Sequence, residues 1–468
     1  MIRTVIAVII LLISVTACTM MPKYQQPGSP VPKDWPTGAS YKESAASDKT
    51  AADIPWQEFF TDPVLQKLIG DAIANNRDMR VAVLNIERSA ALYQIQRAPL
   101  FPEIDGTANA NFQRVPTAFS TTGTVQEVHQ YSVGLGLAAY ELDLFGRVRS
   151  LKAQALYQYL ATEQARRAVQ ITIVSQVAIA YLNLLADKEH LQLAKDTFTN
   201  QEAYYKMIEN RFKVGINSAL DLNQARTSVE AARSDIASFT TLVAQDENFL
   251  SLLVGKPIDT SSFPPNISGN IISLKDIAPG TSSDVLLNRP DILQAEDQLK
   301  GANANIGAAR AAFFPRITLV SSVGFGAADI AKLFEPGSFA WNISPNITIP
   351  IFDAGVNKAN LAVANVDRNI YIAQYEKAIQ TAFREVADAL AQRGTIDEQM
   401  AAQQAFTDAT RESYKLSKAR FDQGIDSFLN VLDSQRSMYS AEQNLITTKL
   451  TQLANLVTLY KVLGGGEK

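Results

Sequence analysis

The sequence predicts a mostly α-helical protein with a transmembrane β part, in which a helix-strand-strand-helix-helix unit occurs twice in tandem. Three observations predict this fold class. Stretches free of Gly and Pro recur at a fixed offset of 209 residues, as between Gly215 and Gly424. Short segments of strictly alternating hydrophobicity precede the longest of these stretches. The N-terminus has the pattern of an export signal, which directs the chain across the cytoplasmic membrane.

The longest elements are two helices expected at 147–214 and 356–423. These stretches contain no proline, and Gly394 is their only glycine. Ala, Leu, Gln, Glu, Lys and Arg dominate them, and all six are good helix formers. A helix of this length extends about 100 Å at ~1.5 Å per residue. Such a helix must bury an apolar stripe along other long helices.

Shorter helices complete each unit. Residues 216–254 and 425–463 again lack Gly and Pro, and they predict return helices of about 58 Å. A further helix at roughly 64–98 adds about 52 Å. Laid end to end, the two short helices match the long one. Each half is therefore expected to consist of two antiparallel columns of about equal length.

The duplication sets the domain organisation. The phrase "QIQRAPLFPEI" (94–104) matches "NIGAARAAFFPRI" (305–317), upstream of the long helix in each half. We expect the first repeat at 62–255, a linker at 256–282 and the second repeat at 283–468.

The N-terminus is expected to carry a signal peptide at 1–17. Arg3 gives it a positive start, and the apolar run 5–15 is too short for a permanent membrane helix. Its ending, "VTAC", resembles a bacterial lipobox. That resemblance implies cleavage before Cys18 and attachment of lipid to this residue. The alternative is a plain signal peptide with an incidental cysteine.

A lipid-anchored tether is expected to follow at 18–61. The segment contains six prolines, which favour an extended chain. Thr19, rather than Asp, resembles the residue found after the cysteine in lipoproteins sent to the outer membrane. Cys18 is the only cysteine, so the mature chain has no disulfide framework and no second thiol.

Four segments switch from a helical period to a period of two. Apolar residues alternate with polar or small ones in 103–113, 130–141, 316–326 and 339–350. Strands of this length suit a membrane-spanning β-barrel, which needs ~9–11 residues per strand. The alternative is a soluble four-stranded sheet that caps a helical bundle. The export signal and the expected anchor favour the membrane, which tolerates only helices and closed barrels.

Four strands cannot close a barrel alone, since about eight are needed merely to hold side chains inside. Strands in lipid therefore require several chains to share one barrel. Three chains would give about twelve strands, enough for an open lumen, and cyclic symmetry is the usual arrangement of such oligomers. If three chains share a 12-stranded barrel in this way, the helices would form a second, helical barrel below the strands.

Several phrases resemble those of one known family, the TolC-type outer-membrane efflux channels, and most closely its OprM- and MtrE-like lipoprotein branch. The resemblance covers nearly the whole mature chain. It is carried by "YELDLFGRVRS" (140–150), "GAARAAFFP" (307–315), "PIFDAGVNKANL" (350–361), "QYEKAIQTAFREVADAL" (374–390), the two "RF…G…S.L" phrases and "LYKVLGGG" (459–466).

The resemblance implies a homotrimer with one shared barrel in the bacterial outer membrane and a long periplasmic α-helical barrel. It also implies two partners: a periplasmic adaptor (membrane fusion) protein and an inner-membrane transporter, usually of the proton-driven RND class. The expected function is a passive exit duct for drugs and other small molecules. Secretion of proteins through the same type of channel is one alternative. A periplasmic coiled-coil lipoprotein scaffold without a pore is the other.

Composition and motifs give no sign of an enzyme or of a nucleic-acid-binding protein. Basic and acidic residues number 43 and 47, for a formal charge of −4, and no clustered basic surface is expected. His129 and His190 lack metal-ligand spacing, and we expect them in a surface loop and on a helix face. "SVGFGA" (322–327) lies in a strand without a following helix, so its glycines suit close packing or bending. We expect no metal and no cofactor besides the lipid on Cys18.

A periplasmic gate is expected at Leu429 and Asp433. These residues are four apart on one helix face, shortly after the break at Gly424. The family places its closed constriction at the second-repeat tip, and the two positions match the Leu and Asp rings of the OprM-like branch. In a trimer each becomes a ring of three; acidic rings select cations, and apolar rings exclude water. The alternative for an acidic residue near a helix N-terminus is dipole stabilisation.

The two helix breaks are expected to be hairpin tips. Glycine permits the positive φ of a reversal, and the serines that follow are suited to cap the returning helices. The tips can meet a periplasmic partner end-on. The residues expected to contact the adaptor are Gly215, Ser218, Leu220, Asp221, Gly424, Asp426 and Ser427.

The second tip departs from TolC itself at two positions. Asn430 stands where TolC has a further Asp, and Asp426 corresponds to an Arg of the TolC tip. The salt-bridge lock proposed for that relative therefore does not carry over unchanged.

Overall fold

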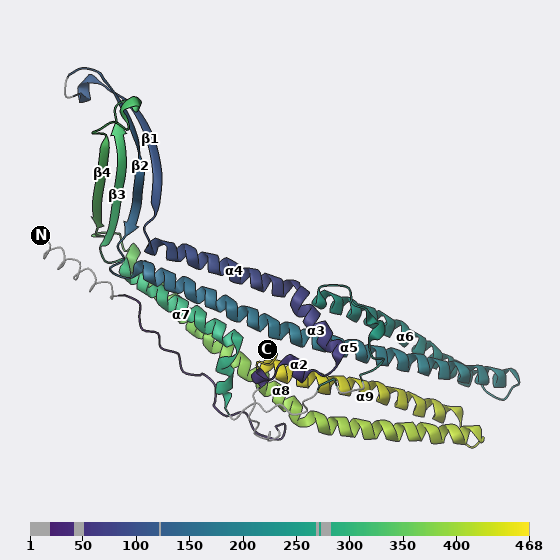
Figure 1. The fold of residues 1–468 in the computed structure, drawn as a ribbon. Coiled ribbons are helices and arrows are strands. Elements are labelled where there is room, and N and C mark those ends of the chain that lie inside the picture. The colour runs from purple at the N-terminus through teal and green to yellow at the C-terminus, as the bar shows by residue number, and fades with distance from the viewer. Residues whose placement is uncertain (1–18, 42–50, 121–122, 268–270, 273–281, 468) are drawn as a thin grey trace. The chain divides into compact units, whose positions relative to one another are not determined.

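The computed structural model describes residues 19–41, 51–120, 123–267, 271–272 and 282–467. The expected signal peptide and Cys18 lie outside the described residues. Figure 1 shows the elements in chain order. They are η1 (Ala51–Asp53), α2 (Trp56–Phe59), α3 (Pro63–Asn75), α4 (Arg77–Arg97), η2 (Ala98–Leu100), β1 (Ile104–Val115), η3 (Thr117–Phe119), β2 (Gln126–Glu141), α5 (Arg147–Lys213), α6 (Ala219–Val254), η4 (Thr260–Ser262), η5 (Ser283–Asn288), α7 (Pro290–Ala311), β3 (Arg316–Ala327), η6 (Ile330–Lys332), β4 (Phe339–Thr348), α8 (Val356–Asp422) and α9 (Phe428–Val462).

The chain forms two compact units, and each contains segments of both repeats. The first, here called the sheet unit, comprises Met1–Gly28, Asn85–Glu163 and Gln294–Tyr375. The second, here called the hairpin unit, comprises Ser29–Leu84, Gln164–Leu293 and Glu376–Lys468. The compact units therefore cut across the repeats. The long helices α5 and α8, of 67 residues each, contribute to both units.

The helix expected at roughly 64–98 is two helices, and this expectation was wrong at Asn76. The backbone of Asn76 is extended, with φ −60° and ψ 138°. Its side-chain oxygen accepts from the N–H groups of Asp78 and Met79, at 2.8 and 3.1 Å, and so caps α4. Its side-chain nitrogen donates to the Leu253 carbonyl at 2.8 Å. A buried asparagine thus breaks the helix, because its amide satisfies backbone groups at the break.

The four strands form one antiparallel sheet in the order β1-β2-β3-β4. The central pair, β2 and β3, joins the two repeats, with Leu135 opposite Val323. Each of β1 and β4 pairs along one side only within the described part of the chain. The sheet therefore has two open edges, one from each repeat.

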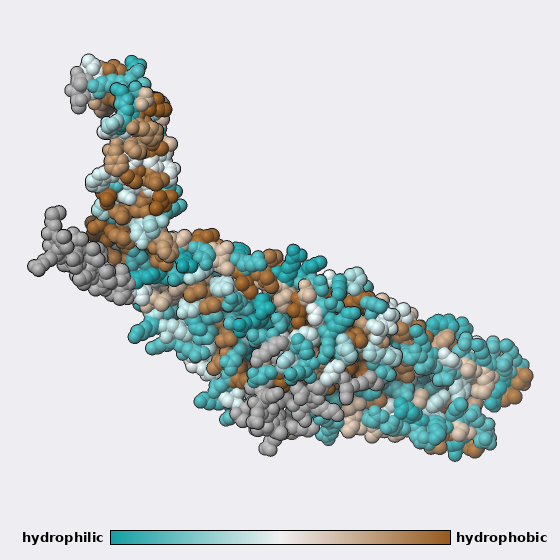
Figure 2. Space-filling view, viewed as in Figure 1, coloured by the Kyte–Doolittle hydropathy of each residue, from teal (hydrophilic) through white to brown (hydrophobic). Residues whose placement is uncertain are grey.

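One face of the sheet is apolar, and much of this face is exposed in the single chain. Cross-strand register places Leu135, Val323 and Trp341 in one row of this face. Apolar side chains cover much of the strands in Figure 2. The most exposed are Ile104, Phe112, Trp341, Ile343 and Ile347, each at least 60% exposed. This is the pattern of strands that face lipid.

Two glycines on the opposite face allow β2 and β3 to approach closely. A Cβ on Gly134 would lie 2.5 Å from the Val323 carbonyl oxygen and 3.0 Å from the Gly324 Cα. A Cβ on Gly324 would in turn collide with the Val133 carbonyl. The strand glycines therefore permit close backbone packing, as the sequence predicts for "SVGFGA".

The tether follows helix α7 in the sheet unit. The Pro22 carbonyl accepts from Asn303 Nδ2 at 2.8 Å, and the Tyr24 hydroxyl donates to Glu296 at 3.0 Å. A Cβ on Gly307 would lie 2.7 Å from the Met21 Cα, so only glycine leaves room for the tether there. These contacts fix the described start of the tether against the helices of the sheet unit.

The core of the hairpin unit brings the N-terminal and C-terminal segments together. Phe59 stacks on Tyr460 with ring centroids 4.0 Å apart, and the Tyr460 hydroxyl donates to the Ile54 carbonyl at 2.6 Å. The Tyr181 hydroxyl donates to Asp62, the N-cap of α3, at 2.8 Å. One stretch of α5 is apolar and long enough to cross a membrane, yet 67% of it is buried inside the protein.

Candidate functional site at the two hairpin tips

Both helical hairpins turn through the same backbone motif. Gly215 and Gly424 have φ of 81° and 74°, a region that favours glycine. The Ile216 N–H donates to the Arg211 carbonyl at 2.8 Å, and Ile425 donates to Arg420 at 2.9 Å. These bonds satisfy carbonyls at the ends of α5 and α8, as in a Schellman turn.

The first tip is held by a capping box. The Ser218 hydroxyl accepts from the Asp221 N–H at 3.1 Å, and the Asp221 carboxylate accepts from the Ser218 N–H at 2.9 Å. Asn217 Nδ2 adds a third bond to the same carboxylate at 3.2 Å. The hydrogen bond from the Ser218 backbone lowers the pKa of Asp221 below its usual value. The Asp221 carboxylate therefore stabilises the turn by accepting hydrogen bonds within it.

The second tip has a different polar arrangement. Ser427 occupies the N-cap of α9, but its side chain makes no capping bond. Asn430 stands where the first repeat has Asp221, so the capping box is missing. Instead, Arg420 Nε lies 2.5 Å from the Asp426 carboxylate across the turn. This ion pair lowers the pKa of Asp426.

Each tip exposes apolar side chains. Val214, Ile216 and Leu220 are 65–70% exposed in the first tip, and Ile425 is 63% exposed in the second. Apolar side chains at the end of a hairpin have no intramolecular surface to cover. The tips therefore offer small apolar patches.

An apolar cluster packs the two tips together within the hairpin unit. It consists of Tyr204, Ile208, Ala225, Phe421, Phe428, Val431 and Leu432. The Arg211 guanidinium lies 5.4 Å above the Phe421 ring, which links the first tip to the second.

Polar bonds also join the return helices α6 and α9. The Tyr439 hydroxyl donates to Asp235 at 2.9 Å, and the Arg436 guanidinium lies 3.3 Å from the Ser228 hydroxyl. These bonds link the two repeats at a level just behind the apolar cluster.

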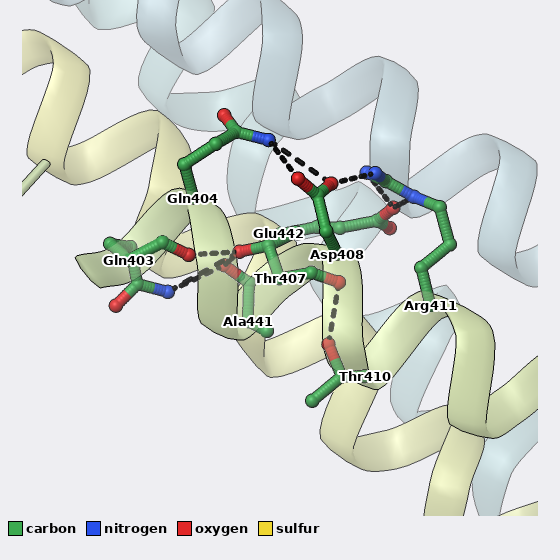
Figure 3. A network of polar contacts seen from close by, with 8 residues as sticks. All are labelled: Gln403, Gln404, Thr407, Asp408, Thr410, Arg411, Ala441 and Glu442. Atoms are coloured by element: carbon green, nitrogen blue, oxygen red, sulfur yellow. Dashed lines mark hydrogen bonds and ion pairs between the residues drawn. The ribbon is translucent and has the colours of Figure 1, made fainter. Parts of the chain in front are cut away.

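A polar network holds α8 to α9 farther from the tip (Figure 3). Thr407 is fully buried, and its hydroxyl contacts the Ala441 carbonyl at 3.2 Å. Arg411 bridges the two helices, at 2.9 Å from Glu442 of α9 and 2.9 Å from Asp408 of its own helix. These contacts join α8 to α9 behind the second tip.

The expected gate residues lie on the free face of α9. Leu429 is 51% exposed, and Asp433 is also exposed. The opposite face of α9 buries Phe428, Val431 and Leu432 in the apolar cluster. Among the described residues, Asp433 has no hydrogen-bond or ion-pair partner. Both side chains therefore point away from the packed interior of the chain.

The described residues contain no group of three or more His, Cys, Asp or Glu side chains suited to a metal ion. His129 was expected in a surface loop, and this was wrong, because it lies in β2 and packs edge-on against Phe112 of β1, at 5.2 Å between centroids. His190 lies on a helix face, as expected. That face of α5 is packed, since His190 is buried and stacks on Phe239 at 5.0 Å.

One feature of the hairpins could not be predicted from the sequence. The Arg420–Asp426 pair spans a turn, and its only signal is that the two residues lie six apart, on either side of Gly424. The lipidation site at Cys18 lies outside the described residues, so the fold does not bear on it.

Comparison with known proteins identifies the family. A family model described as outer membrane efflux protein matches residues 68–256 and 281–465. The solvent efflux pump outer membrane protein SrpC of Pseudomonas putida is 47% identical over 456 residues, covering 97% of each chain. The antibiotic efflux pump outer membrane protein ArpC of Pseudomonas putida is 47% identical over 449 residues, covering 96% of this chain and 93% of ArpC.

A solved structure matches over the same range. The open state of the Neisseria gonorrhoeae MtrE outer membrane channel superimposes with a TM-score of 0.87 and 39% identity, covering 96% of this chain and 99% of that one. The four strands, the duplicated long helices and the two tips are thus found in a protein of related sequence. The chain belongs to the outer membrane efflux protein family, which is not an enzyme family, and it is an outer-membrane channel of an efflux pump.

Proposed function

We propose that the channel is a homotrimer in which three sheets close one barrel of about twelve strands. The observation that carries this proposal is the sheet itself, with one exposed apolar face and two open edges. An open edge in lipid would leave backbone N–H and C=O groups without partners, which is costly. Pairing β4 of one copy with β1 of the next removes every edge, and a cyclic arrangement closes after three copies.

The helices next to the sheet edges support the same arrangement. α4 leads into β1, and within the sheet unit it exposes Leu92 and Ile95. α8 follows β4, and there it exposes Val363, Val366 and Ile370. A neighbouring copy brought in by edge pairing would cover these side chains. The helices would then continue the β-barrel as a periplasmic α-helical barrel.

The tips are proposed to bind the periplasmic adaptor of a tripartite pump. The residues in question are Gly215, Ser218, Leu220, Asp221, Gly424, Asp426 and Ser427. Apolar side chains between well-ordered turns suit end-on contact with another protein. An inner-membrane transporter, of the RND class in our proposal, supplies the energy.

Leu429 and Asp433 are proposed to form the closed gate at the second tip. Both are exposed on the face of α9 that points away from the apolar cluster. Three copies would bring three leucines and three aspartates around one axis. Apolar rings exclude water, and acidic rings favour cations. The gate opens when adaptor and transporter draw the tips apart.

We further propose that Cys18 carries a lipid anchor and that the cargo consists of small apolar molecules and antibiotics. The described tether begins beside α5 and α7, which would bring an anchor to the sheet unit. The relatives named for solvent and antibiotic efflux support this cargo class.

Two experiments test the proposal. The purified protein should run on gels as trimers that dissociate on heating. In planar bilayers it should give step-like conductance. A monomer that does not conduct would overturn the channel arrangement. Deletion of the gene, followed by a panel of solvents, antibiotics and secreted proteins, identifies the cargo. Loss of resistance to the small molecules is expected, and a defect in protein secretion alone would overturn the cargo class.

A further inference from the structure

The contact between α5 and α7 joins the two repeats next to the central strand pair. α5 follows β2 and α7 precedes β3, and both helices belong to the sheet unit at this level. A Cβ built on Gly301 of α7 would lie 3.5 Å from the Gln154 carbonyl oxygen and 3.6 Å from the Tyr157 Cβ of α5. These are ordinary van der Waals distances. The two inner helices are therefore in direct contact, with Gly301 against Gln154 and Tyr157.

The duplication supplies the same two helices a second time, at the outer ends of the sheet. α4 precedes β1 as α7 precedes β3, and the two stretches match at an offset of 213 residues, as Arg97 and Arg310 do. α8 follows β4 as α5 follows β2, at the offset of 209 residues that relates Gly146 to Gly355. The outer helices α4 and α8 are thus the counterparts of a pair that is in contact within the chain.

Equivalent positions are buried on the inner helices and exposed on the outer ones. Ala308 of α7 is 8% exposed, whereas its counterpart on α4, Ile95, is 61% exposed. Ser150 of α5 is 1% exposed, and its Oγ atom would lie 2.5 Å from a Cβ on Gly307 of α7. Its counterpart on α8, Ala359, is exposed. The outer helices therefore leave uncovered the faces by which the inner helices pack.

These uncovered faces have the spacing of a helix–helix contact. On α8 the exposed residues recur at alternate steps of four and three, and we call them the α8 stripe: Val356, Ala359, Val363, Val366, Ile370 and Ala373. On α4 the exposed residues Arg88, Ala91 and Ile95 have the same spacing within the sheet unit. Residues at this spacing form the line of contact between two long helices. Each outer helix thus presents half of such a contact.

Arg88 is the one charged residue of the exposed face on α4. The Arg88 side chain is exposed, and among the described residues it has no hydrogen-bond or ion-pair partner. It is the only basic residue between Val81 and Gln96. A positive charge at this position requires a negative partner when another helix covers the face, because burial of an unpaired charge is costly.

Asp367 provides a negative charge at the edge of the α8 stripe. It follows Val366 and is the only acidic residue between Val356 and Tyr375. The neighbouring Arg368 is directed to Asn369, at 3.4 Å. In the described part of the chain Asp367 has no hydrogen-bond or ion-pair partner either. The two outer helices therefore carry complementary charges that are unused within one chain.

The strands bring these two helices to the same level when copies pair edge to edge. α4 runs toward β1, and α8 runs away from β4 (Figure 1). Six residues, 98–103, separate α4 from β1, and seven residues, 349–355, separate β4 from α8. Antiparallel pairing of β4 with β1 of the next copy therefore places the ends of the two helices side by side, with the helices antiparallel.

We propose that α8 of one copy packs on α4 of the next as α5 packs on α7 within a chain, and that Arg88 pairs there with Asp367 of the neighbouring copy. By the two offsets, Arg88 corresponds to Gly301 and lies against Val363 and Val366, the counterparts of Gln154 and Tyr157. This register brings the guanidinium beside Asp367, the residue after Val366. The contact presupposes the homotrimer proposed above and specifies how its helices are joined.

Cysteine pairs in the full-length protein test the register. In the inner contact, the Cβ built on Gly301 lies 3.6 Å from the Tyr157 Cβ, and a disulfide spans about 3.5–4.5 Å between Cβ atoms. Arg88→Cys combined with Val366→Cys should therefore give covalent dimers and trimers after mild oxidation, on denaturing gels without reductant. Arg88→Cys combined with Ala373→Cys is the matched control, because Ala373 lies on the same stripe about 10 Å farther along α8. This control and each single variant should run as monomers.

The outcomes separate the helix contact from the homotrimer. Mobility of the unheated native protein shows whether trimers form at all. Native trimers without covalent products from the Arg88 and Val366 cysteines would overturn the helix contact and leave the homotrimer standing. Equal crosslinking of the control pair would overturn the register. Absence of native trimers would overturn both proposals.

Charge reversal tests the ion pair. Arg88→Asp and Asp367→Arg each place like charges together at every contact between copies, so trimers should dissociate several degrees below the native protein on heating. The double reversal restores opposite charges and should recover most of the native dissociation temperature. Lys358→Asp is the matched control, because Lys358 is exposed on α8 outside the stripe, and it should dissociate with the native protein. Single reversals without effect, or additive losses in the double reversal, overturn the ion pair.

Discussion

The Arg420 guanidinium lies 2.5 Å from the Asp426 carboxylate, and the two residues close the turn at Gly424 from opposite sides. The first repeat has Arg211 at the equivalent position, but Asn217 stands where the second has Asp426. Arg211 lies over the Phe421 ring instead. The ion pair therefore belongs to the second tip alone, which is the tip that carries the proposed gate.

Asp426→Asn is expected to loosen the second tip and to raise the conductance of the closed channel. The amide cannot hold the guanidinium as the carboxylate does, so the turn gains freedom. Single-channel recording in planar bilayers measures the change. Lys415→Ala is the matched control, because among the described residues Lys415 pairs only with Glu412 of its own helix, at 3.2 Å. Equal conductance in Asp426→Asn and the native channel would rule out a role in closure.

The same pair predicts how closure depends on pH. Arg420 lowers the pKa of Asp426, so the closing contribution is present at neutral pH and is lost only as the pH falls through this lowered value. Conductance of the native channel should therefore show no step from this pair between pH 5 and 8. A step in that window that disappears in Asp426→Asn would show that the pKa is not lowered.

Leu429→Ala combined with Asp433→Ala is expected to raise conductance severalfold and to sensitise cells to large antibiotics. Both side chains are exposed and lie outside the apolar cluster, so their truncation to alanine should leave the fold intact. Gln224→Ala changes the first-repeat position equivalent to Asp433 and is the control, because Gln224 is not among the proposed adaptor contacts. Equal permeability of the gate double variant and the native channel would remove these residues from the gate.

The sequence was sufficient for the features that arise from long-range periodicity. Two helices free of proline, each closed by a glycine with positive φ, follow from local chemistry alone, and the observed helices end at Lys213 and Asp422. Alternating strands likewise follow from period-two patterning. The break at Asn76 was missed, because its signal is a tertiary hydrogen bond to Leu253 rather than a Gly or Pro.

The finer chemistry of the candidate site could be predicted only in part. Ser218 and Ser427 look alike in sequence, yet only Ser218 makes a capping bond, because Asp221 completes its box and Asn430 does not. Position along a helix can be predicted from sequence, but a side chain's partner on another helix cannot.

The serine pair gives a direct test of that difference. Ser218→Ala should destabilise the first turn of α6 by about 1 kcal/mol, the usual effect of losing an N-cap. Ser427→Ala should have little effect on α9, because its side chain makes no capping bond. Hydrogen exchange of the two helix starts measures both variants in the full protein. Equal destabilisation of the two helices would contradict the asymmetry of the tips.

Gly134→Val is expected to prevent closure of the barrel. A Cβ at this position meets the Val323 carbonyl oxygen at 2.5 Å, and backbone atoms of a central strand pair cannot move aside without breaking the ladder between β2 and β3. Folding of the helices does not require this contact, so the variant should accumulate with helical content but without heat-sensitive trimers. Gel mobility before and after heating, together with circular dichroism, separates these two properties.

Gly106→Val is the matched control on β1, because its nearest neighbour is a Leu135 methyl group at 3.9 Å, and it should still form trimers. Native trimer yield in Gly134→Val would show that the sheet can open at this pair, and the close approach would then have no part in assembly.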